Sequence, residues 1–226
     1  MTFRTAYLCD FDGTIAPSDV GARFARAFAA DGGAAFHALE AGWRDGTLGH
    51  RELTEAECRV LRVDEREAHA FVRRFAVDPA FAAFVERAEA RGDAVHVVSE
   101  GFDFYIAPLL EAAGLSRLPV AANRLRFVAG GAVPEFPYAD DSCGRCGNCK
   151  AQHVRAWRAR GYRTVMVGDG LSDRCGAREA DAVVARRGLL EWCRAEGVAA
   201  RAFDSFADFI AMDDATGPGA AAAAGS

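Results

Sequence analysis

Short apolar runs alternate with helical patterns along most of the chain. Three runs, Thr5–Cys9, Ala94–Val98 and Thr164–Val167, are followed at once by polar residues, and a fourth spans Ala182–Ala185. Their length and apolar content predict buried strands. The stretches between them carry apolar residues every three or four positions, which is typical of helices. Strands that alternate with helices predict an α/β fold with a parallel sheet and right-handed crossovers.

The stretch between the first two strands has a different character. Residues 19–78 contain three apolar helical faces, built around Phe24, Leu53 and Phe71, and no strand pattern. Because this block is too long for one crossover, we interpret residues 17–79 as an inserted helical domain. The helices that connect the later strands are expected at Pro79–Arg91, Asp103–Gly114, Lys150–Arg160, Asp173–Ala180, Leu189–Glu196 and Ser205–Met212.

The remaining patterns complete the expected organisation. Val120–Phe127 and Ala132–Phe136 flank a Gly-Gly pair and predict a small two-stranded flap. The α/β core would then comprise residues 1–16 and 80–212. Residues 213–226 are rich in Gly and Ala without any periodicity, and we expect them to form a disordered tail.

Composition and charge narrow the class of protein. The 226 residues, 51% of them apolar, suffice for one domain with a sizeable core. Lys and Arg number 27 against 32 Asp and Glu, and the net charge of −5 argues against nucleic acid as a partner. A small phosphorylated metabolite in a local pocket fits this charge. No apolar run approaches the roughly 20 residues that cross a bilayer, so no membrane partner is expected.

The start of the chain and the cysteines bear on localisation. The first residues lack the apolar stretch and small-residue cleavage site of a signal peptide. The chain has 7 cysteines, an odd number, and four of them are isolated in the sequence, which favours reduced thiols. We therefore expect a cytoplasmic protein, for which monomer and homodimer are both open.

Polar clusters follow the three apolar runs that are expected to end at one edge of the sheet. Open α/β sheets bind ligands at that edge. Carboxylates crowded together repel one another unless a cation neutralises them, and oxygen ligands without histidine suit Mg²⁺. The clusters consist of Asp10, Asp12 and Thr14, of Ser99, Glu100 and Gly101, and of Asp169, Ser172 and Asp173.

Lys150, the single lysine among 27 basic residues, begins the helix before the third of these strands. An Arg-rich coding bias can leave one lysine by chance. Alternatively, only a compact ammonium fits at this position. An ammonium beside Mg²⁺ suits a phosphate group. A carboxylate that faces the phosphate can attack it and form an acyl phosphate, and a second carboxylate two residues on can protonate the leaving oxygen.

Four motifs in this order resemble those of the haloacid dehalogenase (HAD) superfamily of phosphatases. They are DFDGT at 10–14, Ser99 after an apolar strand, Lys150, and GDGLSD at 168–173. The resemblance covers nearly the whole chain apart from the tail. It implies an HAD-like Rossmannoid core of three layers, with a helical cap inserted after the first strand. Dehalogenases of the superfamily lack the second aspartate of the first motif, so Asp12 favours a phosphate ester as substrate.

The resemblance also implies a role for each motif residue. Asp10 would be the nucleophile and Asp12 the general acid and base. Ser99 and Lys150 would bind the phosphoryl group during its transfer, and Lys150 would also screen the charge of Asp10.

A magnesium site and a substrate site follow from the same resemblance. Asp10, the main-chain carbonyl of Asp12 and Asp169 would hold Mg²⁺, with Asp173 as a further carboxylate. The expected substrate-binding residues are Thr14, which would orient Asp12, Glu100 and Gly101 through their backbone, and Trp43 and Arg44 in the insert.

Two longer segments point to a narrower group within the superfamily. A helical insert between the first two motifs is typical of the phosphoserine-phosphatase-like branch, subfamily IB. SEGFDFYIAPLL at 99–110 and CGRCGNCK at 143–150 look like MtnX-type phosphatases. Those enzymes act on 2-hydroxy-3-keto-5-methylthiopentenyl-1-phosphate in methionine salvage. Phosphoethanolamine and phosphocholine phosphatases carry a similar Cys-rich run. Phosphoethanolamine, phosphocholine, phosphoserine and phosphates of specialised metabolism therefore stay open as alternative substrates.

Three further alternatives concern particular residues or the function as a whole. The spacing of three cysteines, Cys143, Cys146 and Cys149, is that of zinc ligands, and Cys175 or His153 could complete such a site. The alternative interpretation is a Gly-rich loop of small residues that only positions Lys150. His50 and Arg51 in the insert could also face a substrate, although helix ends on the surface are a simpler reading. A phosphometabolite-binding protein without catalysis is the alternative to an enzyme.

Overall fold

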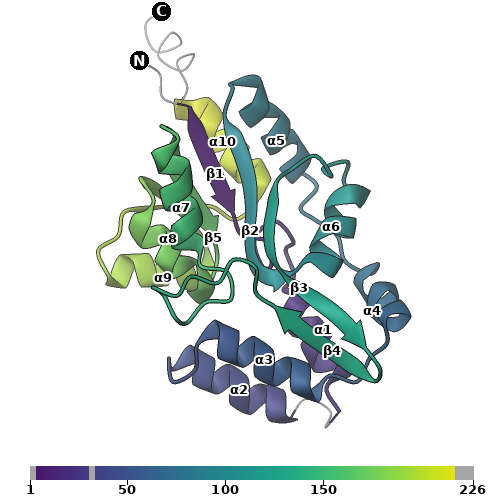
Figure 1. Ribbon diagram of the computed structural model, residues 1–226. Helices are drawn as coiled ribbons and strands as arrows, with labels where there is room; N and C mark the ends of the chain where they lie inside the picture. Colours follow the sequence, from purple (N-terminus) through teal and green to yellow (C-terminus); the bar gives the residue numbers. More distant parts are fainter. Residues whose placement is uncertain (1–3, 31–33, 217–226) are drawn as a thin grey trace, which may run out of the picture.

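A seven-stranded sheet forms the centre of the computed structural model, which describes residues 4–30 and 34–216 (Figure 1). Its strands are β1 (Thr5–Cys9), β2 (Ala94–Phe102), β3 (Val120–Val128), β4 (Gly131–Glu135), β5 (Arg163–Gly168), β6 (Ala182–Ala185) and β7 (Ala200–Ala202). They lie in the order β4-β3-β2-β1-β5-β6-β7. All neighbouring pairs are parallel except β3 and β4. The α/β fold with a parallel sheet is confirmed.

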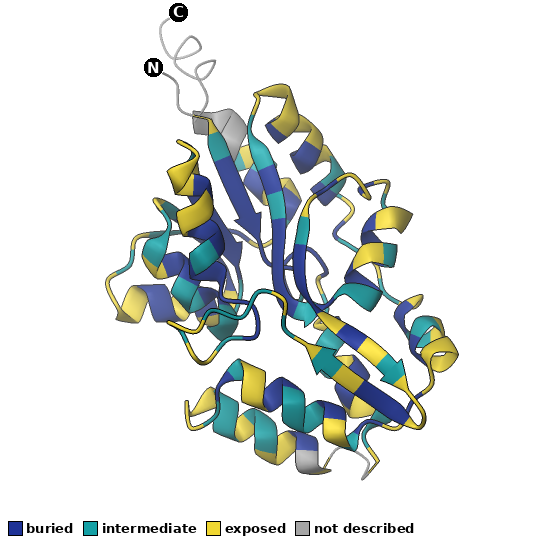
Figure 2. Cartoon of the chain, viewed as in Figure 1, coloured by how far each residue is buried: buried dark blue, intermediate teal, exposed yellow. Residues whose placement is uncertain are grey.

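The central strand β1 is buried on both of its faces (Figure 2). Tyr7 and Cys9 point to one side of the sheet and Ala6 and Leu8 to the other, because side chains alternate along a strand. A central parallel strand is covered by helices on both faces, so it needs a continuous apolar run rather than an alternating one. The strand therefore delivers the chain to the interior of the molecule at its carboxyl end.

Helices cover both faces of the sheet and complete three layers. One side carries α5 (Phe81–Ala90), α6 (Asp103–Ala112) and α10 (Phe206–Thr216). The other side carries α7 (Lys150–Ala159), α8 (Arg174–Glu179) and α9 (Arg187–Ala195). Separate apolar clusters lie on the two sides, as expected when each helix buries one face against a sheet. Across the described residues, no helix has the length and apolar character needed to cross a membrane.

Four helices form the block between β1 and α5, and we call them the helical insert. They are α1 (Val20–Phe28), α2 (Ala34–Arg44), α3 (His50–Val60) and α4 (Glu65–Val72). Phe24 of α1 contacts Phe71 of α4 and Phe104 of α6, so the insert shares an apolar core with one helical layer. α2 and α3 lie beyond the carboxyl ends of the central strands (Figure 1). The insert is thus placed over the edge where the sequence predicts a site.

The expected two-stranded flap is present, but its first strand also belongs to the main sheet. β3 pairs antiparallel with β4 from Arg124 to Val128. Before this, Val120 and Ala121 pair in parallel with the middle of β2. β4 in turn lies against α3 of the insert (Figure 1). The hairpin is therefore an extension of the sheet toward the insert.

Several boundaries differ from the sequence-based expectation. β7 is not predicted by the sequence, because Ala-Arg-Ala has no apolar run, and only its pairing with β6 makes it a strand. β2 continues to Phe102 through an irregular register, so Ser99 lies within it. α5 begins at Phe81 rather than Pro79. α10 extends to Thr216, four residues into the expected tail, and residues 217–226 of that tail lie outside the described residues.

Asp78 joins the starts of two helices on one face of the sheet. Its side chain is buried, and the carboxylate accepts hydrogen bonds from the amides of Ala80 (2.8 Å) and Phe206 (3.1 Å). Phe206 is the first residue of α10, and the first amides of a helix have no partner within the helix. One carboxylate therefore anchors α5 and α10 to each other.

We expect Asp78→Ala to lower the free energy of unfolding by about 2 kcal/mol, since two amides lose their acceptor in a buried place. Urea unfolding followed by circular dichroism measures the loss. Asp64→Ala is the matched control, because Asp64 accepts from the Glu67 amide at the start of α4 but is exposed. Its loss should be about 1 kcal/mol or less. Equal losses in the two variants would contradict the anchoring role.

Candidate active site

The candidate site lies where the order of the strands reverses. β2 and β5 flank β1, so the chain leaves β1 toward one side of the sheet and later returns on the other. In open α/β sheets this switch point, at the carboxyl ends of the strands, is where ligands bind. Asp10 follows β1 and Asp169 follows β5, while Asp173 ends the short helix η1 (Leu171–Asp173) and Lys150 begins α7. The structure brings all four side chains together.

Lys150 is the centre of this arrangement. Its side chain is fully buried, and Nζ donates hydrogen bonds to Oδ1 of Asp10 and, at 2.5 Å, to Oδ1 of Asp173. The second oxygen of Asp173 accepts from the amides of Asp169 and Gly170, both at 2.9 Å. A Cβ at Gly168 would lie 2.4 Å from the Asp173 carboxylate, so only glycine fits there. The GDG segment is therefore shaped around Asp173.

The site has an excess of negative charge. Oxygens of Asp10, Asp169 and Asp173 lie within 4.8 Å of one another, and one buried ammonium faces them. Burial raises the pKa of Asp10 well above its usual value against the pull of Lys150, and the charges of Asp173 and Asp169 add to the rise. Burial alone would lower the pKa of Lys150, but Asp10 and Asp173 raise it, so Lys150 stays cationic.

These carboxylates fit a divalent cation. Three hard oxygen ligands with no histidine among them match the ligands of Mg²⁺ rather than those of softer metals. Burial raises the pKa of both Asp10 and Asp169, and the charge of Asp173 adds to the rise in each case. A cation bound between these carboxylates would relieve the repulsion between their charges. The guanidinium of Arg187 offsets only part of the negative charge of the cluster, because it lies at an exposed position, 3.1 Å from Asp169.

Asp12 is held separately from the other carboxylates. Its Oδ1 accepts from the amides of Val20 (2.7 Å) and Gly21 (3.2 Å) at the start of α1, and its Oδ2 accepts from the Tyr105 hydroxyl (2.5 Å). Burial, with the nearby charge of Asp19, raises the pKa of Asp12 to about 7, although the Tyr105 hydroxyl opposes the rise. A carboxyl group with such a pKa can release and take up a proton near neutral pH.

Ser99 lines the same cavity and is fixed from both sides. Its Oγ accepts from the Gly101 amide at 2.9 Å, and its carbonyl accepts from the side-chain amide of Asn148 at 2.9 Å. Asn148 also donates to the carbonyl of Ala121, at 2.8 Å.

A Cβ at Gly101 would lie 1.8 Å from the Tyr105 hydroxyl oxygen, so the glycine makes room for the tyrosine that binds Asp12. Gly101 thus supports Asp12.

The Glu100 side chain connects the core to the insert. Its Oε2 lies 2.8 Å from His50 Nδ1 in α3 and accepts from the Gly147 amide at 2.9 Å. Burial would lower the pKa of His50, but the Glu100 carboxylate raises it, and His50 in turn lowers the pKa of Glu100 against the effect of burial. A half-buried His50 therefore pairs with the buried Glu100 carboxylate, and this contact anchors the insert beside Ser99.

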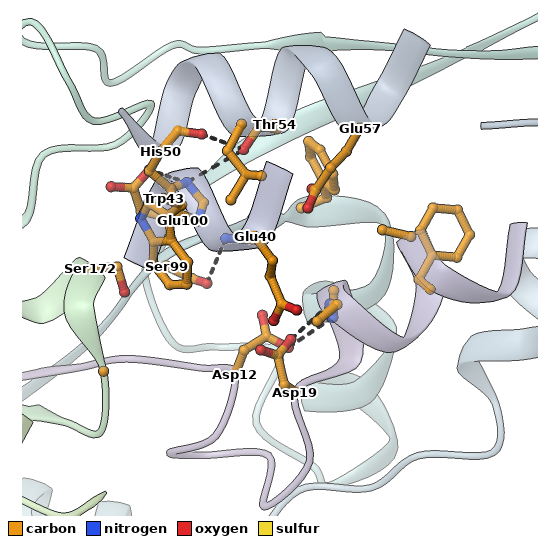
Figure 3. Close-up of a pocket in the computed structure, with 18 of the residues that line it drawn as sticks. Asp12, Asp19, Glu40, Trp43, His50, Thr54, Glu57, Ser99, Glu100 and Ser172 are labelled. Atoms are coloured by element: carbon orange, nitrogen blue, oxygen red, sulfur yellow. Dashed lines mark hydrogen bonds and ion pairs between the residues drawn. The ribbon is translucent and has the colours of Figure 1, made fainter. Parts of the chain in front are cut away.

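A cavity of about 180 Å³ lies between these residues and the insert. Asp10, Asp12 and Ser99 line one end, and Trp43 and His50 contribute from the insert. No arginine or lysine is among the described residues that line it. Figure 3 shows the carboxyl groups of the lining residues Asp12, Asp19 and Glu40 directed toward one another, with Glu57 reaching down from α3. The end of the cavity formed by the insert is apolar and acidic: its side chains include Phe24, Phe36, Leu53, Leu61, Asp19, Glu40 and Glu57.

Two expected site residues take other positions. Arg44 is exposed, pairs with Glu40 at 2.9 Å and does not line the cavity, because the last turn of α2 directs it to solvent. Thr14 is buried, but its hydroxyl donates to Asp169 at 3.5 Å, and the structure gives it no hydrogen bond to Asp12. The partner of Asp12 is Tyr105 instead.

Four residues of the site were not singled out by sequence reasoning. Tyr105 and Asn148 lie in segments whose patterns indicate only a helix and a loop. Arg186 is buried and donates to the carbonyls of Gly13 and Thr14, and Arg187 donates to Gly13 and Asp169. One signal was available, because two adjacent arginines follow directly after the apolar strand at Ala182–Ala185.

Comparison with known proteins connects this geometry to a family. A family model described as haloacid dehalogenase-like hydrolase matches residues 7–178. The 2-hydroxy-3-keto-5-methylthiopentenyl-1-phosphate phosphatase of Geobacillus kaustophilus is 31% identical over 93% of this chain and 96% of its own length. The enzyme of that name from Exiguobacterium sibiricum is 29% identical over 93% and 95%. The bifunctional enzyme MtnB/MtnX of Bacillus licheniformis is 32% identical over 89% of this chain, which spans 47% of that protein.

Solved structures show the same fold at lower identity. A phospho-aspartyl intermediate analogue of phosphoserine phosphatase superposes with a TM-score of 0.70 at 20% identity, over 90% of this chain and 95% of that one. Phosphoserine phosphatase from T. onnurineus gives a TM-score of 0.70 at 18% identity, over 93% and 94%. The three-layer core and the helical insert are thus a known architecture.

We expect Lys150→Met to lower the free energy of unfolding by about 3–5 kcal/mol in EDTA at pH 8, because it leaves two buried carboxylates without their cation. Arg155→Met is the matched control on the same helix. Arg155 pairs with Asp140 and Glu179 at the surface, and its loss should cost about 1 kcal/mol or less. Urea unfolding of both variants measures the difference. Similar losses would show that Lys150 does not neutralise the cluster.

Proposed function

Because the chain belongs to the haloacid dehalogenase-like hydrolase family, we propose that it hydrolyses a small phosphate monoester with Mg²⁺ as its metal ion. The observation that carries the proposal is the pairing of two differently held carboxylates. Asp10 lies against the Lys150 ammonium, and Asp12 is held apart with a pKa of about 7. One carboxylate is suited to attack and the other to proton transfer.

The two carboxylates divide the reaction into two steps. In the first, a carboxylate oxygen of Asp10 bonds to phosphorus, the bond from phosphorus to the ester oxygen breaks, and Asp12 gives its proton to the departing alcohol. In the second, Asp12 takes a proton from water as the water oxygen attacks phosphorus. The bond to Asp10 then breaks, which releases inorganic phosphate and restores both carboxyl groups. Lys150 and Ser99 bind the phosphoryl oxygens.

Asp10, the main-chain carbonyl of Asp12 and Asp169 are the residues that would hold Mg²⁺, with Asp173 completing the acidic set behind them. The bound ion supplies positive charge to the phosphoryl oxygens and so lowers the repulsion between two anions. Asp173 also keeps Lys150 in place, since both oxygens of its carboxylate are engaged.

The insert acts as the cap of this enzyme, with residues 17–79 as its extent. It covers the cavity on the side away from the sheet, and the pair of His50 and Glu100 holds it beside Ser99. A covered cavity excludes bulk water during the first step, when water would compete with the Asp10 carboxylate for phosphorus. The cavity of about 180 Å³ suits a small phosphorylated metabolite of the cytoplasm.

Asp10→Asn tests the proposed reaction. We expect phosphate release with Mg²⁺ to fall by a factor on the order of 10⁴ or more, because the amide cannot act as nucleophile. The thermal midpoint should not fall below that of wild type, since one of three repelling carboxylates is removed. Asp64→Asn, an exposed helix start in the insert, is the control and should keep full activity. Appreciable turnover by a folded Asp10→Asn protein would refute the assignment.

The leaving group is restricted by the charges in the cavity. An anionic leaving group such as serine, with its carboxylate, would face Asp19, Glu40 and Glu57 without an arginine or lysine among the described lining residues. The apolar lining and the named relatives support a neutral leaving group, as in the methylthiopentenyl phosphate. This ester of methionine salvage is our first candidate.

A second candidate substrate is favoured by the acidic side of the cavity. Burial raises the pKa of Glu57 to about 7, and the charges of Asp19 and Glu40 add to the effect. A cationic group would relieve this repulsion and could also stack on Trp43. Phosphoethanolamine and phosphocholine present such a group.

Glu57→Gln separates the two candidates. If the leaving group is cationic, KM for phosphocholine or phosphoethanolamine should rise about tenfold with little change in kcat, because one charge-assisted contact is lost. KM for the methylthiopentenyl phosphate should change less than about twofold. Glu55→Gln on the same helix is the control, since Glu55 pairs with Arg51 and Arg59 and does not line this cavity. Wild-type turnover of the methylthiopentenyl phosphate alone would exclude the cationic candidate.

A further inference from the structure

Four cysteine side chains from two separate segments meet outside the cavity. Cys143, Cys146 and Cys149 lie in the loop before α7, and Cys175 lies in α8. Their four Sγ atoms lie within 4.8 Å of one another. All four are free thiols rather than disulfides. The fold thus adds a fourth thiol to a three-cysteine loop from a distant part of the sequence.

The geometry of this cluster matches one kind of ligand. A zinc ion bound to four thiolates has zinc–sulfur distances of about 2.3 Å, which places the sulfur atoms about 3.8 Å apart at the corners of a tetrahedron. Among the described residues, His153 is not part of this cluster, and its Nε2 lies 2.6 Å from Asn148 Oδ1 instead. Soft thiolates in this number and arrangement select zinc over magnesium.

We propose that Cys143, Cys146, Cys149 and Cys175 bind one structural Zn²⁺. Binding replaces the protons of the four thiols, which pass to solvent, so that four zinc–sulfur bonds form without any redox change. Four protein ligands fill the tetrahedron and leave no position for water or substrate. The ion would therefore stabilise the structure and take no part in the chemistry at Asp10.

The positions of the four cysteines indicate what the zinc would hold. Cys149 is the residue before Lys150, and Cys175 lies two residues after Asp173. A zinc ion shared by these cysteines ties α7 to α8 on both sides of the buried pair of Lys150 and Asp173. Zinc would then help to fix the distance between the Lys150 ammonium and the Asp173 carboxylate, because each of these residues lies within two positions of a zinc ligand.

The same loop also contacts the insert. Arg145 lies between two of the cysteines, and its guanidinium donates to the carbonyls of Gly46 (2.7 Å) and Leu48 (3.0 Å). Its own carbonyl accepts from the Arg51 amide at 3.0 Å. A Cβ at Gly49 would lie 2.8 Å from that carbonyl oxygen, so the two backbones are in direct contact. Zinc would thus fix the surface on which the insert rests.

The experiment is a metal analysis of the full-length protein purified in reducing buffer without chelator. Mass spectrometry of the metal content should find about one zinc per chain in wild type. Cys175→Ser should retain about a tenth of that amount or less, because three thiolates hold zinc far more weakly than four. Cys193→Ser removes a buried thiol of α9 outside the cluster and should keep the full amount.

Reconstitution with Co²⁺ gives a second readout that needs no variant. Wild type should show the visible bands of tetrahedral cobalt together with thiolate-to-cobalt charge transfer, and added Zn²⁺ should abolish both. Absence of both signals in folded, reduced wild type, with less than about a tenth of an equivalent of zinc after reconstitution, would overturn the proposal. Iron in place of zinc, or disulfides among these cysteines under the same reducing conditions, would overturn it as well.

Discussion

One buried ammonium group, that of Lys150, holds the centre of this molecule together. It lies between Asp10 and Asp173, which come from the end of β1 and from η1, while the lysine itself begins α7. A buried charge without a partner is costly, so these three elements stay together as a unit. The neighbouring backbone is shaped to the same end, because Gly168 admits the Asp173 carboxylate and two amides fix it. The remaining negative charge is what would favour a divalent cation at this site.

The sheet and the insert contribute different properties to the cavity. The sheet edge supplies the carboxylates of the proposed reaction, whose positions follow from parallel strands that end together. The insert supplies the far wall, whose side chains are acidic and apolar. Contacts between the two parts include the pair of His50 and Glu100, the Arg145 backbone against α3, and the packing of Phe24 on Phe104. Chemistry and specificity can therefore vary separately on this fold.

The sequence predicts the parts of this structure that depend on local pattern. β1, β5 and the four motifs follow from apolar runs and adjacent polar residues, and the structure brings Asp10, Lys150, Asp169 and Asp173 together as expected. Prediction from the sequence misses the features that only tertiary contacts create. β7 is a strand because β6 offers it hydrogen bonds, and Tyr105 looks like a core residue because its hydroxyl finds Asp12 only in the fold. Arg44 lies on an exposed face of α2, and helical spacing alone does not say which face of this helix meets the cavity.

The choice of lysine at position 150 follows from the space around it. Lys150 is the single lysine of the chain, and arginine occupies all the remaining Lys and Arg positions. At position 150, however, a fully buried cation must reach two carboxylates at once. An ammonium directs three donors from a single atom, whereas a guanidinium is a planar fork that needs room on both sides. The base of the lysine side chain is tightly packed as well, since a Cβ at Gly176 would lie 3.1 Å from Lys150 Cβ and 2.8 Å from Met166 Sδ. The same close packing of α7 against α8 brings Cys175 to the three cysteines before Lys150. The lysine and the thiol cluster are thus two results of one tight contact between these helices.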